Sequence, residues 1–261
     1  MKAARFAFAA AVATLPAWLY AAPAVAAEIH VLCAGAARSS VVPLVEPFER
    51  ATGHKVRMDF GTAGQIQARL REGARPDVVI VTSTVVAELE KAGTVAPGSA
   101  ADLGRTGIGV AVREGAAAPD ISSVDAFRRA LLAARAVAYI DPAAGGTSGK
   151  HFAGVLARLG IENEIRAKAV LVPGGYAAER VARGEADIVV HQISEILPVK
   201  GVRLVGPLPP ELQLYTTYTA ALVAYANAGA PNAGAARAWM QTLSGPAGRK
   251  SFTDKGLEVP K

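Results

Sequence analysis

The sequence contains few cysteine, histidine and aromatic residues, and the scarcity of each type argues against a class of protein. Cys33 is the only cysteine among 261 residues, so no disulfide and no thiolate metal site can form within one chain. We expect Cys33 to be a buried core thiol, because it lies in an apolar run. The four histidines show no spacing typical of a metal site, and we expect neither a metal nor a cofactor.

The sequence also lacks blocks of like charge. The formal net charge is +6, yet the basic residues are scattered, which argues against a nucleic-acid-binding tail. A mild positive balance is compatible with a small anionic ligand. Hydrophobic residues make up 51% of the chain and aromatic residues 6%, a composition that suits an α/β core of alanine, valine and leucine.

The first residues carry an export signal. Lys2 and Arg5 make the start of the chain basic, an apolar stretch follows at 6–20, and small residues at 21–27 end this region. A proline and an alanine-rich end argue against a membrane span, which needs about 20 strongly apolar residues. We therefore predict that residues 1–27 are a signal peptide, cleaved near Ala26 or Ala27, and that the protein is periplasmic.

Short apolar runs then alternate with amphipathic segments, a pattern that predicts mostly parallel sheets flanked by helices. The predicted strands are Ile29–Leu32, Lys55–Phe60, Val78–Val81, Ile108–Val112, Val137–Ile140, Ala169–Val172, Ile188–Val190, Val202–Val205 and Leu214–Tyr225. Four predicted helices are Ile66–Glu72, Val85–Lys91, Ala233–Leu243 and Pro246–Lys255. Three more are identified by how they start: one is capped by Ser39 or Ser40 and ends near Gly53, one is capped by Ser122, and one follows the loop Ala143–Gly149.

The strand–helix pattern restarts near residue 108, which predicts two lobes. We assign 28–107 and 217–261 to lobe 1 and 108–216 to lobe 2. In open parallel sheets, ligands bind beyond the carboxyl ends of the strands. The loops that follow the predicted strands should therefore face a cleft between the lobes.

These loops supply the candidate ligand-binding residues. An arginine fork matches a carboxylate, so Arg38 is a candidate, although a solvated arginine would be an ordinary alternative. Backbone N–H groups at helix starts bind anions whatever the side chains are. The hydroxyls in these loops could bind a ligand or only cap helices. The candidates are Arg38, Ser39, Thr62, Ala63, Thr82, Ser83, Gly146, Thr147, Ser148, Tyr176, His191 and Gln192.

His191 ends a predicted strand on the cleft side and is the one catalytic candidate. A lone histidine is more often a structural residue. A histidine with a pKa near neutral could instead move a proton as general base and acid. We expect His54 and His151 to be structural, and His30 lies within the first predicted strand.

Five stretches carry a resemblance to a known family: IHVLCAGAARSSVVPLVEPFERATGHKV, DFGTAGQIQARLREGARPDVVIV, YIDPAAGGTSGKHFAGVLARLGI, EADIVVHQISEI and SGPAGRKSFTDKGLEV. They resemble the periplasmic molybdate-binding-protein family, which has the two-lobed type II periplasmic binding fold. The resemblance implies a small anionic ligand. The family's two pocket serines correspond to Ala36 and Ala63, and its pocket tyrosine corresponds to His191. These three departures argue against molybdate.

Further stretches are similar to a divergent branch of that family, which includes aconitate isomerase: DLGRTGIGVAVREGAAAPDIS, VLVPGG, VARGEADIVVHQISEILPVKGV and LVGPLPPELQ. Our first hypothesis is a monomeric receptor that binds a di- or tricarboxylate and passes it to an ABC transporter, with no nucleic-acid partner. The alternative is an aconitate isomerase that uses His191 for an allylic proton shift. A third hypothesis is binding of molybdate or another oxyanion.

Overall fold

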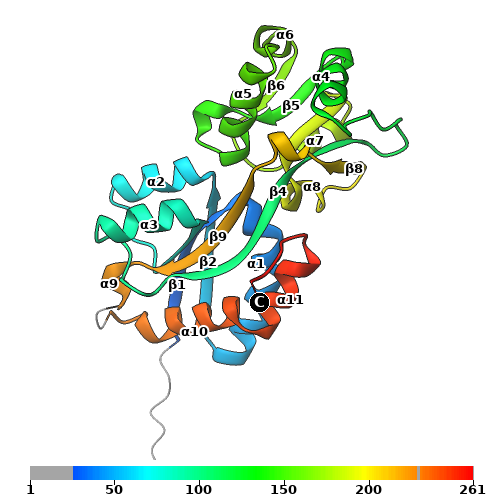
Figure 1. Ribbon diagram of the computed structural model, residues 1–261. Helices are drawn as coiled ribbons and strands as arrows, with labels where there is room; N and C mark the ends of the chain where they lie inside the picture. The colour runs from blue at the N-terminus through cyan, green and yellow to red at the C-terminus, as the bar shows by residue number, and fades with distance from the viewer. Residues whose placement is uncertain (1–25, 228–229, 261) are drawn as a thin grey trace, which may run out of the picture.

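The protein has two lobes joined by a pair of long strands (Figure 1). The computed structural model describes residues 26–227 and 230–260. The predicted signal peptide, apart from its last two residues, lies outside this part of the chain. No helix within these two ranges combines the length and the apolarity needed to cross a bilayer.

Lobe 1 is built on three parallel strands, β1 (Glu28–Ala34), β2 (Lys55–Gly61) and β3 (Val78–Thr82). Strand β9 (Tyr215–Leu222) pairs with β3 in the antiparallel sense. The lobe also contains α1 (Gly35–Thr52), α2 (Ala63–Arg71), α3 (Ser83–Lys91), α9 (Ala224–Asn227), α10 (Ala233–Ser244) and α11 (Pro246–Asp254). Because β3 is covered on both faces, all five of its residues are buried, which explains its continuous apolar run. Cys33 is buried in β1 as expected.

Lobe 2 repeats this plan. Its parallel strands are β5 (Val137–Ile140), β6 (Ala169–Val172) and β7 (Ile188–Gln192). Strand β8 (Val202–Pro207) pairs with β4 (Ala101–Arg113). The helices of this lobe are α4 (Val124–Ala133), α5 (Thr147–Arg158), α6 (Glu162–Arg166), α7 (Ala178–Ala182) and α8 (Ile193–Ile196), with 3₁₀ turns at Pro142–Ala144 and Pro210–Leu212. The two-lobed α/β fold predicted from the sequence is therefore confirmed.

Strand β4 (Ala101–Arg113) belongs to both lobes. Its first half pairs with β9, and its second half pairs with β7 and β8. The sequence predicted only the second half, because the glycine-rich first half lacks an apolar alternation. One core cluster draws on residues 29–103 and 218–257, and two others draw on 108–212. The lobe limits 28–107, 217–261 and 108–216 stay a prediction that these separate cores support.

The predicted start of the first helix is wrong. Helix α1 begins at Gly35, directly after β1, and Ser39 and Ser40 lie inside it. Its N-cap residue is Ala34, which has no side-chain oxygen, so no side chain caps the helix. The small residues that follow the strand allow the chain to turn at once into a helix. As a result, the backbone N–H groups of the first turn remain available to a ligand.

Two other predicted caps are displaced by one residue. Ser123, rather than Ser122, caps α4, because the hydroxyl of Ser122 donates to Asp120 Oδ1 at 2.7 Å. Thr82, rather than Ser83, caps α3, and its Oγ1 accepts from the N–H of Val85 at 3.4 Å.

Candidate functional site

A cavity of about 240 Å³ lies between the lobes. It is smaller than the pockets that hold drug-sized ligands, which span about 300–1,000 Å³. Its lining consists of Ala34, Gly35, Ala36, Arg38, Phe60, Gly61, Thr62, Ala63, Gln65, Ile140, Gly146, Thr147, Ser148, Gly174, Gly175, Tyr176, His191, Gln192, Glu195 and Tyr218. Most of these residues lie at or just after the ends of strands from both lobes, as the strand-end rule predicts, whereas Glu195 lies in α8 and Tyr218 lies inside β9.

The lobes contact each other beside this cavity. The N–H of Gly64 in lobe 1 donates to the carbonyl of Gly145 in lobe 2 at 3.2 Å. The hydroxyl of Thr62 donates to the carbonyl of Ala144, and Gln65 Nε2 donates to the carbonyl of Pro173 at 3.1 Å. These contacts hold the lobes in a closed arrangement around the cavity.

Glycine at position 64 is required for this closure. A Cβ at Gly64 would lie 2.8 Å from the Cα of Gly145, closer than two carbon atoms can approach. We therefore expect Gly64→Ala to weaken ligand binding about tenfold, because about 1.4 kcal/mol of misfit at the closed contact costs that factor. Gly234→Ala in α10 is the control, since no atom lies within 4 Å of its added Cβ. Isothermal titration would test this, and equal affinities in the two variants would contradict the assignment of the contact.

Three helices begin at the cavity wall. Helices α1 and α5 have no side-chain cap, while Thr62 and Gln65 form a capping box at the start of α2. Each helix N-terminus is equivalent to about half a positive charge. Free N–H groups and helix dipoles together make this wall suited to anions.

Arg38 is the cationic side chain of the cavity lining. Its guanidinium lies over the ring of Phe60, 4.7 Å from the centroid, and it has no carboxylate partner among the described residues. An arginine held in this way is available to an anionic ligand. Ala36 and Ala63 also line the cavity and contribute no hydrogen-bond donor from their side chains.

His191 is buried in the lining, with 1% of its side chain exposed. The N–H of Gln192 donates to His191 Nδ1 at 2.9 Å, and the hydroxyl of Ser148 lies 3.2 Å from the same nitrogen. Because a backbone N–H can only donate, Nδ1 is the unprotonated nitrogen. The proton is then on Nε2, which lies 3.2 Å from the carbonyl oxygen of Gly175. Burial lowers the pKa of His191 to about 4, so the imidazole is a neutral base.

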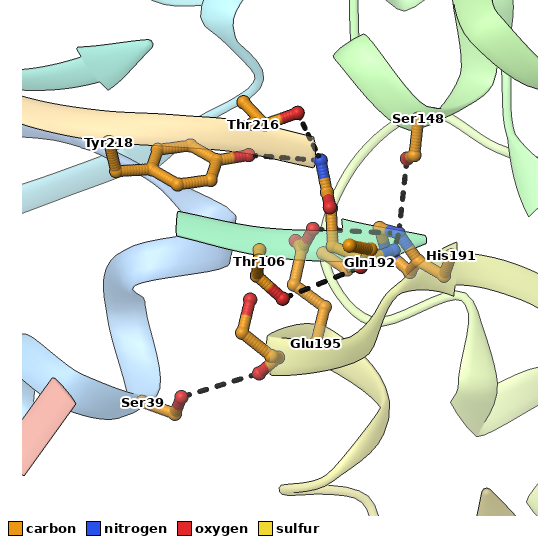
Figure 2. A network of polar contacts seen from close by, with 11 residues as sticks. Ser39, Thr106, Ser148, His191, Gln192, Glu195, Thr216 and Tyr218 are labelled. Carbon is orange, nitrogen blue, oxygen red and sulfur yellow. Dashed lines mark hydrogen bonds and ion pairs between the residues drawn. The ribbon is translucent and has the colours of Figure 1, made fainter. Parts of the chain in front are cut away.

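Glu195 lies beside His191 and is also buried (Figure 2). Its Oε2 is 3.5 Å from His191 Nδ1. Burial raises the pKa of Glu195 to about 8, so the carboxyl group carries a proton at neutral pH. A Cβ at Gly35 would lie 2.7 Å from Oε1, so glycine at the start of α1 makes room for this side chain. Its titratable neighbours are Cys33, Tyr176, His191 and Tyr218.

The raised pKa of Glu195 makes stability depend on pH. Between the ordinary value of 4.5 and about 8, the folded protein retains a proton that the unfolded chain releases. Stability is therefore lost as the pH rises through this window, by up to about 1.4 kcal/mol per pH unit. Glutamine does not titrate, so Glu195→Gln should gain stability relative to wild type between about pH 5 and about pH 8.

Thermal unfolding at several pH values tests this expectation, and His191 is present in both proteins, so its own titration largely cancels. Glu164→Gln, which alters an exposed glutamate on α6, is the control and should show no such trend. A difference between Glu195→Gln and wild type that stays constant with pH would contradict a protonated Glu195.

Gln192 connects the cavity to the strands between the lobes. Its Nε2 donates to Thr216 Oγ1 at 3.1 Å and to the Tyr218 hydroxyl at 3.4 Å, both on β9 (Figure 2). Its Oε1 has no partner among the described residues. Tyr176 lies across the cavity lining, and burial raises the pKa of its phenol, which stays a neutral donor.

Most of the candidates from the sequence lie together in this cavity. Those that line it are Arg38, Thr62, Ala63, Gly146, Thr147, Ser148, Tyr176, His191 and Gln192. Three candidates do not. Ser39 donates to the carbonyl of Ser194 at 3.4 Å, because α1 starts at Gly35 and Ser39 lies inside the helix rather than at its cap. Thr82 caps α3 and lines a separate pocket, which shares Ala63 and Thr147 with the cavity, and Ser83 is the first residue of α3.

The remaining histidines make structural contacts. His30 Nε2 lies 2.8 Å from Asp59 Oδ2, His54 accepts from the N–H of Ala27, and His151 Nε2 lies 2.7 Å from the carbonyl of Leu212. Within the described ranges, no three histidine, cysteine or acidic side chains are grouped so that they could hold a metal ion.

Sequence reasoning missed Glu195, Gln65, Phe60 and Tyr218 as lining residues. Gln65 could have been found, because a threonine followed three residues later by glutamine is a capping box at the start of a helix. Glu195 left a weaker signal, an acidic residue inside the apolar segment 193–197, four residues after His191.

Comparisons with known proteins agree with this architecture. The model of the bacterial extracellular solute-binding protein family matches residues 29–258. A Pseudomonas sp. aconitate isomerase is 34% identical over 238 residues, which cover 88% of this chain and 87% of the relative. The periplasmic molybdate-binding protein of Azotobacter vinelandii has a TM-score of 0.70 at 21% identity, covering 89% of this chain and 100% of that one.

The sulfate-binding protein of Mycobacterium tuberculosis has a TM-score of 0.66 at 20% identity, covering 89% of this chain and 87% of that one. At these identities the solved structures establish the fold, and the family model spans nearly the whole described chain. The resemblance to molybdate-binding proteins and to the branch with aconitate isomerase is confirmed. The chain belongs to the bacterial extracellular solute-binding protein family.

Proposed function

We propose that the protein is an isomerase that interconverts trans- and cis-aconitate in the periplasm. The observation that carries this proposal is His191, a neutral base buried in the wall of a cavity otherwise suited to anions. The proposal is also supported by the Pseudomonas sp. aconitate isomerase, which is 34% identical over most of both chains. This reverses the order of the two leading hypotheses drawn from the sequence.

The charge of the cavity wall suits a polycarboxylate. Three helix N-termini and Arg38 together offer roughly two and a half positive charges, since each helix end counts for about half a charge. The protonated Glu195 adds no opposing negative charge. A substrate with three carboxylates is therefore compensated to within about one charge.

The reaction requires a base beside the methylene carbon of the substrate. In our proposal, the imidazole turns away from the Gln192 N–H and the Ser148 hydroxyl, and the freed His191 Nδ1 removes a proton from the methylene group. The electron pair of the broken C–H bond is delocalised over the allylic carbons. Reprotonation at the former vinyl carbon moves the double bond. The bound carboxylates raise the basicity of His191, because a nearby anion favours the imidazolium form. General acid–base catalysis of this kind contributes about 10² to 10⁴-fold.

A receptor for the same class of anion is the second candidate. The hydrogen bonds between the lobes at Gly64 and Thr62 favour it, because hinge closure on a ligand is how two-lobed receptors act. Such a receptor would pass a di- or tricarboxylate to an ABC transporter. Molybdate is disfavoured as the ligand, because Ala36 and Ala63 provide no side-chain donor.

One experiment separates these functions. The purified protein is incubated with trans-aconitate, and cis-aconitate is measured by chromatography. Thermal shifts are measured in parallel with trans-aconitate, citrate and molybdate, because a ligand that binds only the folded state raises its melting point. We expect cis-aconitate to form and trans-aconitate to stabilise the protein. Stabilisation by carboxylates without any product would favour the receptor, and stabilisation by molybdate alone would exclude both.

A further inference from the structure

Glu195 places a carboxyl group in the lining of a cavity suited to anions, where it gives a receptor no advantage in binding an anion. It lines the cavity together with Arg38 and the starts of α1 and α5, yet it forms no ion pair with lysine or arginine among the described residues. An ionised glutamate here would repel an anionic ligand and would be costly to bury. The group must therefore serve in its protonated form, as a donor of a proton or a hydrogen bond.

The position of Glu195 relative to His191 favours proton transfer. The two residues are four apart at the junction of β7 and α8, and their side chains lie next to each other (Figure 2). Both line the cavity, so they form part of the same wall. The distance of 3.5 Å between Oε2 and Nδ1 allows a proton to pass between them after a small movement. Both side chains are nearly shielded from solvent, with 8% and 1% exposed.

We propose that Glu195 is a second catalytic residue, which donates a proton to one allylic carbon while His191 removes a proton from the other. This inference rests on the proposed isomerase function. Because both groups lie on one wall, both transfers take place on the same face of the planar allylic system.

The proton balance closes within the pair. The resting pair is neutral imidazole and carboxylic acid. His191 Nδ1 takes a proton from the substrate methylene carbon, whose C–H electron pair enters the allylic system. The O–H of Glu195 then protonates the former vinyl carbon, leaving imidazolium and carboxylate. The proton on Nδ1 finally passes to Oε2, which restores the resting pair without an oxidant, a reductant or a proton from solvent.

The test is a single turnover in D₂O with unlabelled trans-aconitate and enzyme in excess, analysed by mass spectrometry. The acid proton of Glu195 is exchanged for deuterium beforehand. We expect the cis-aconitate formed to carry one deuterium atom on its methylene carbon, because the donated proton comes from Glu195 and the removed proton goes to His191. A product free of deuterium would mean that one base returns the same proton, and it would overturn the inference while leaving the isomerase function intact.

The variant Glu195→Gln provides a second readout. Its turnover should fall by about 10² to 10⁴-fold, with trans-aconitate still raising its melting temperature. Glu164→Gln on the exposed face of α6 is the matched control and should turn over like wild type. Turnover of Glu195→Gln within about threefold of wild type would overturn the inference.

If wild type forms no cis-aconitate at all, the proposed function and the inference fail together. The deuterium result stands on wild type alone, so a poorly folded variant does not remove the test.

Discussion

Replacing His191 by asparagine is expected to slow the conversion of trans- to cis-aconitate by about 10² to 10⁴-fold. Asparagine can keep a hydrogen bond near the position of Nδ1, but its amide cannot accept a proton at neutral pH. The wild-type imidazole is held unprotonated by burial, with Nδ1 directed at Ser148 and the N–H of Gln192. The effect should appear in kcat, measured by following cis-aconitate over time.

His151→Asn is the matched control for this variant. His151 lies outside the cavity lining and contacts the carbonyl of Leu212, so its loss should leave turnover close to wild type. Trans-aconitate should raise the melting temperature of both variants, because neither change removes Arg38 or a helix start. Near-normal turnover in His191→Asn would mean that another group is the base.

Adding a methyl group at Gly149 is expected to damage both stability and binding. Gly149 lies in the first turn of α5, and a Cβ there would lie 2.2 Å from the carbonyl oxygen of Ile140. The start of α5 would have to move away from β5, carrying Thr147 and Ser148 with it. We expect Gly149→Ala to lose about 1–3 kcal/mol of unfolding free energy. That loss corresponds to a melting temperature lower by roughly 2–4 °C for each kcal/mol.

Gly154→Ala in the same helix has the opposite expected sign. Its added Cβ meets no atom within 4 Å, and alanine favours a helix over glycine by up to about 1 kcal/mol. Calorimetry and ligand titration of the two variants separate a local clash from a general effect of alanine in α5. Equal stability of both variants would contradict the packing of Gly149 against Ile140.

Much of the fold could be predicted from the sequence because its strands are continuous apolar runs. β3 and β7 are buried on both faces, so their composition alone identified them. Helix starts were less predictable. Ser39 and Ser40 looked like caps, but the small residues Gly35 and Ala36 let the helix begin at the strand end. Several residues near a helix start can act as caps. The packing of the helix decides which of them is used, and the local sequence does not show that packing.

The candidate site also has a part that the sequence predicted and a part that it did not. Arg38, the loop at Gly146 and His191 follow predicted strand ends, so the strand-end rule located them. Glu195 follows no strand directly, and its importance depends on the turn from β7 into α8, which brings it back to His191. The pKa of either side chain depends on burial by segments distant in sequence, which no local pattern reveals.

In the proposed reaction, a buried acid–base pair moves a proton between two carbon atoms of an anionic ligand. Proton NMR of trans-aconitate mixed with a catalytic amount of the purified protein measures this directly, through the vinyl signals of the two isomers. We expect the cis signal to grow until both isomers coexist, and we expect pure cis-aconitate to reach the same mixture. Spectra that stay unchanged while trans-aconitate raises the melting temperature would contradict the proposed proton transfer.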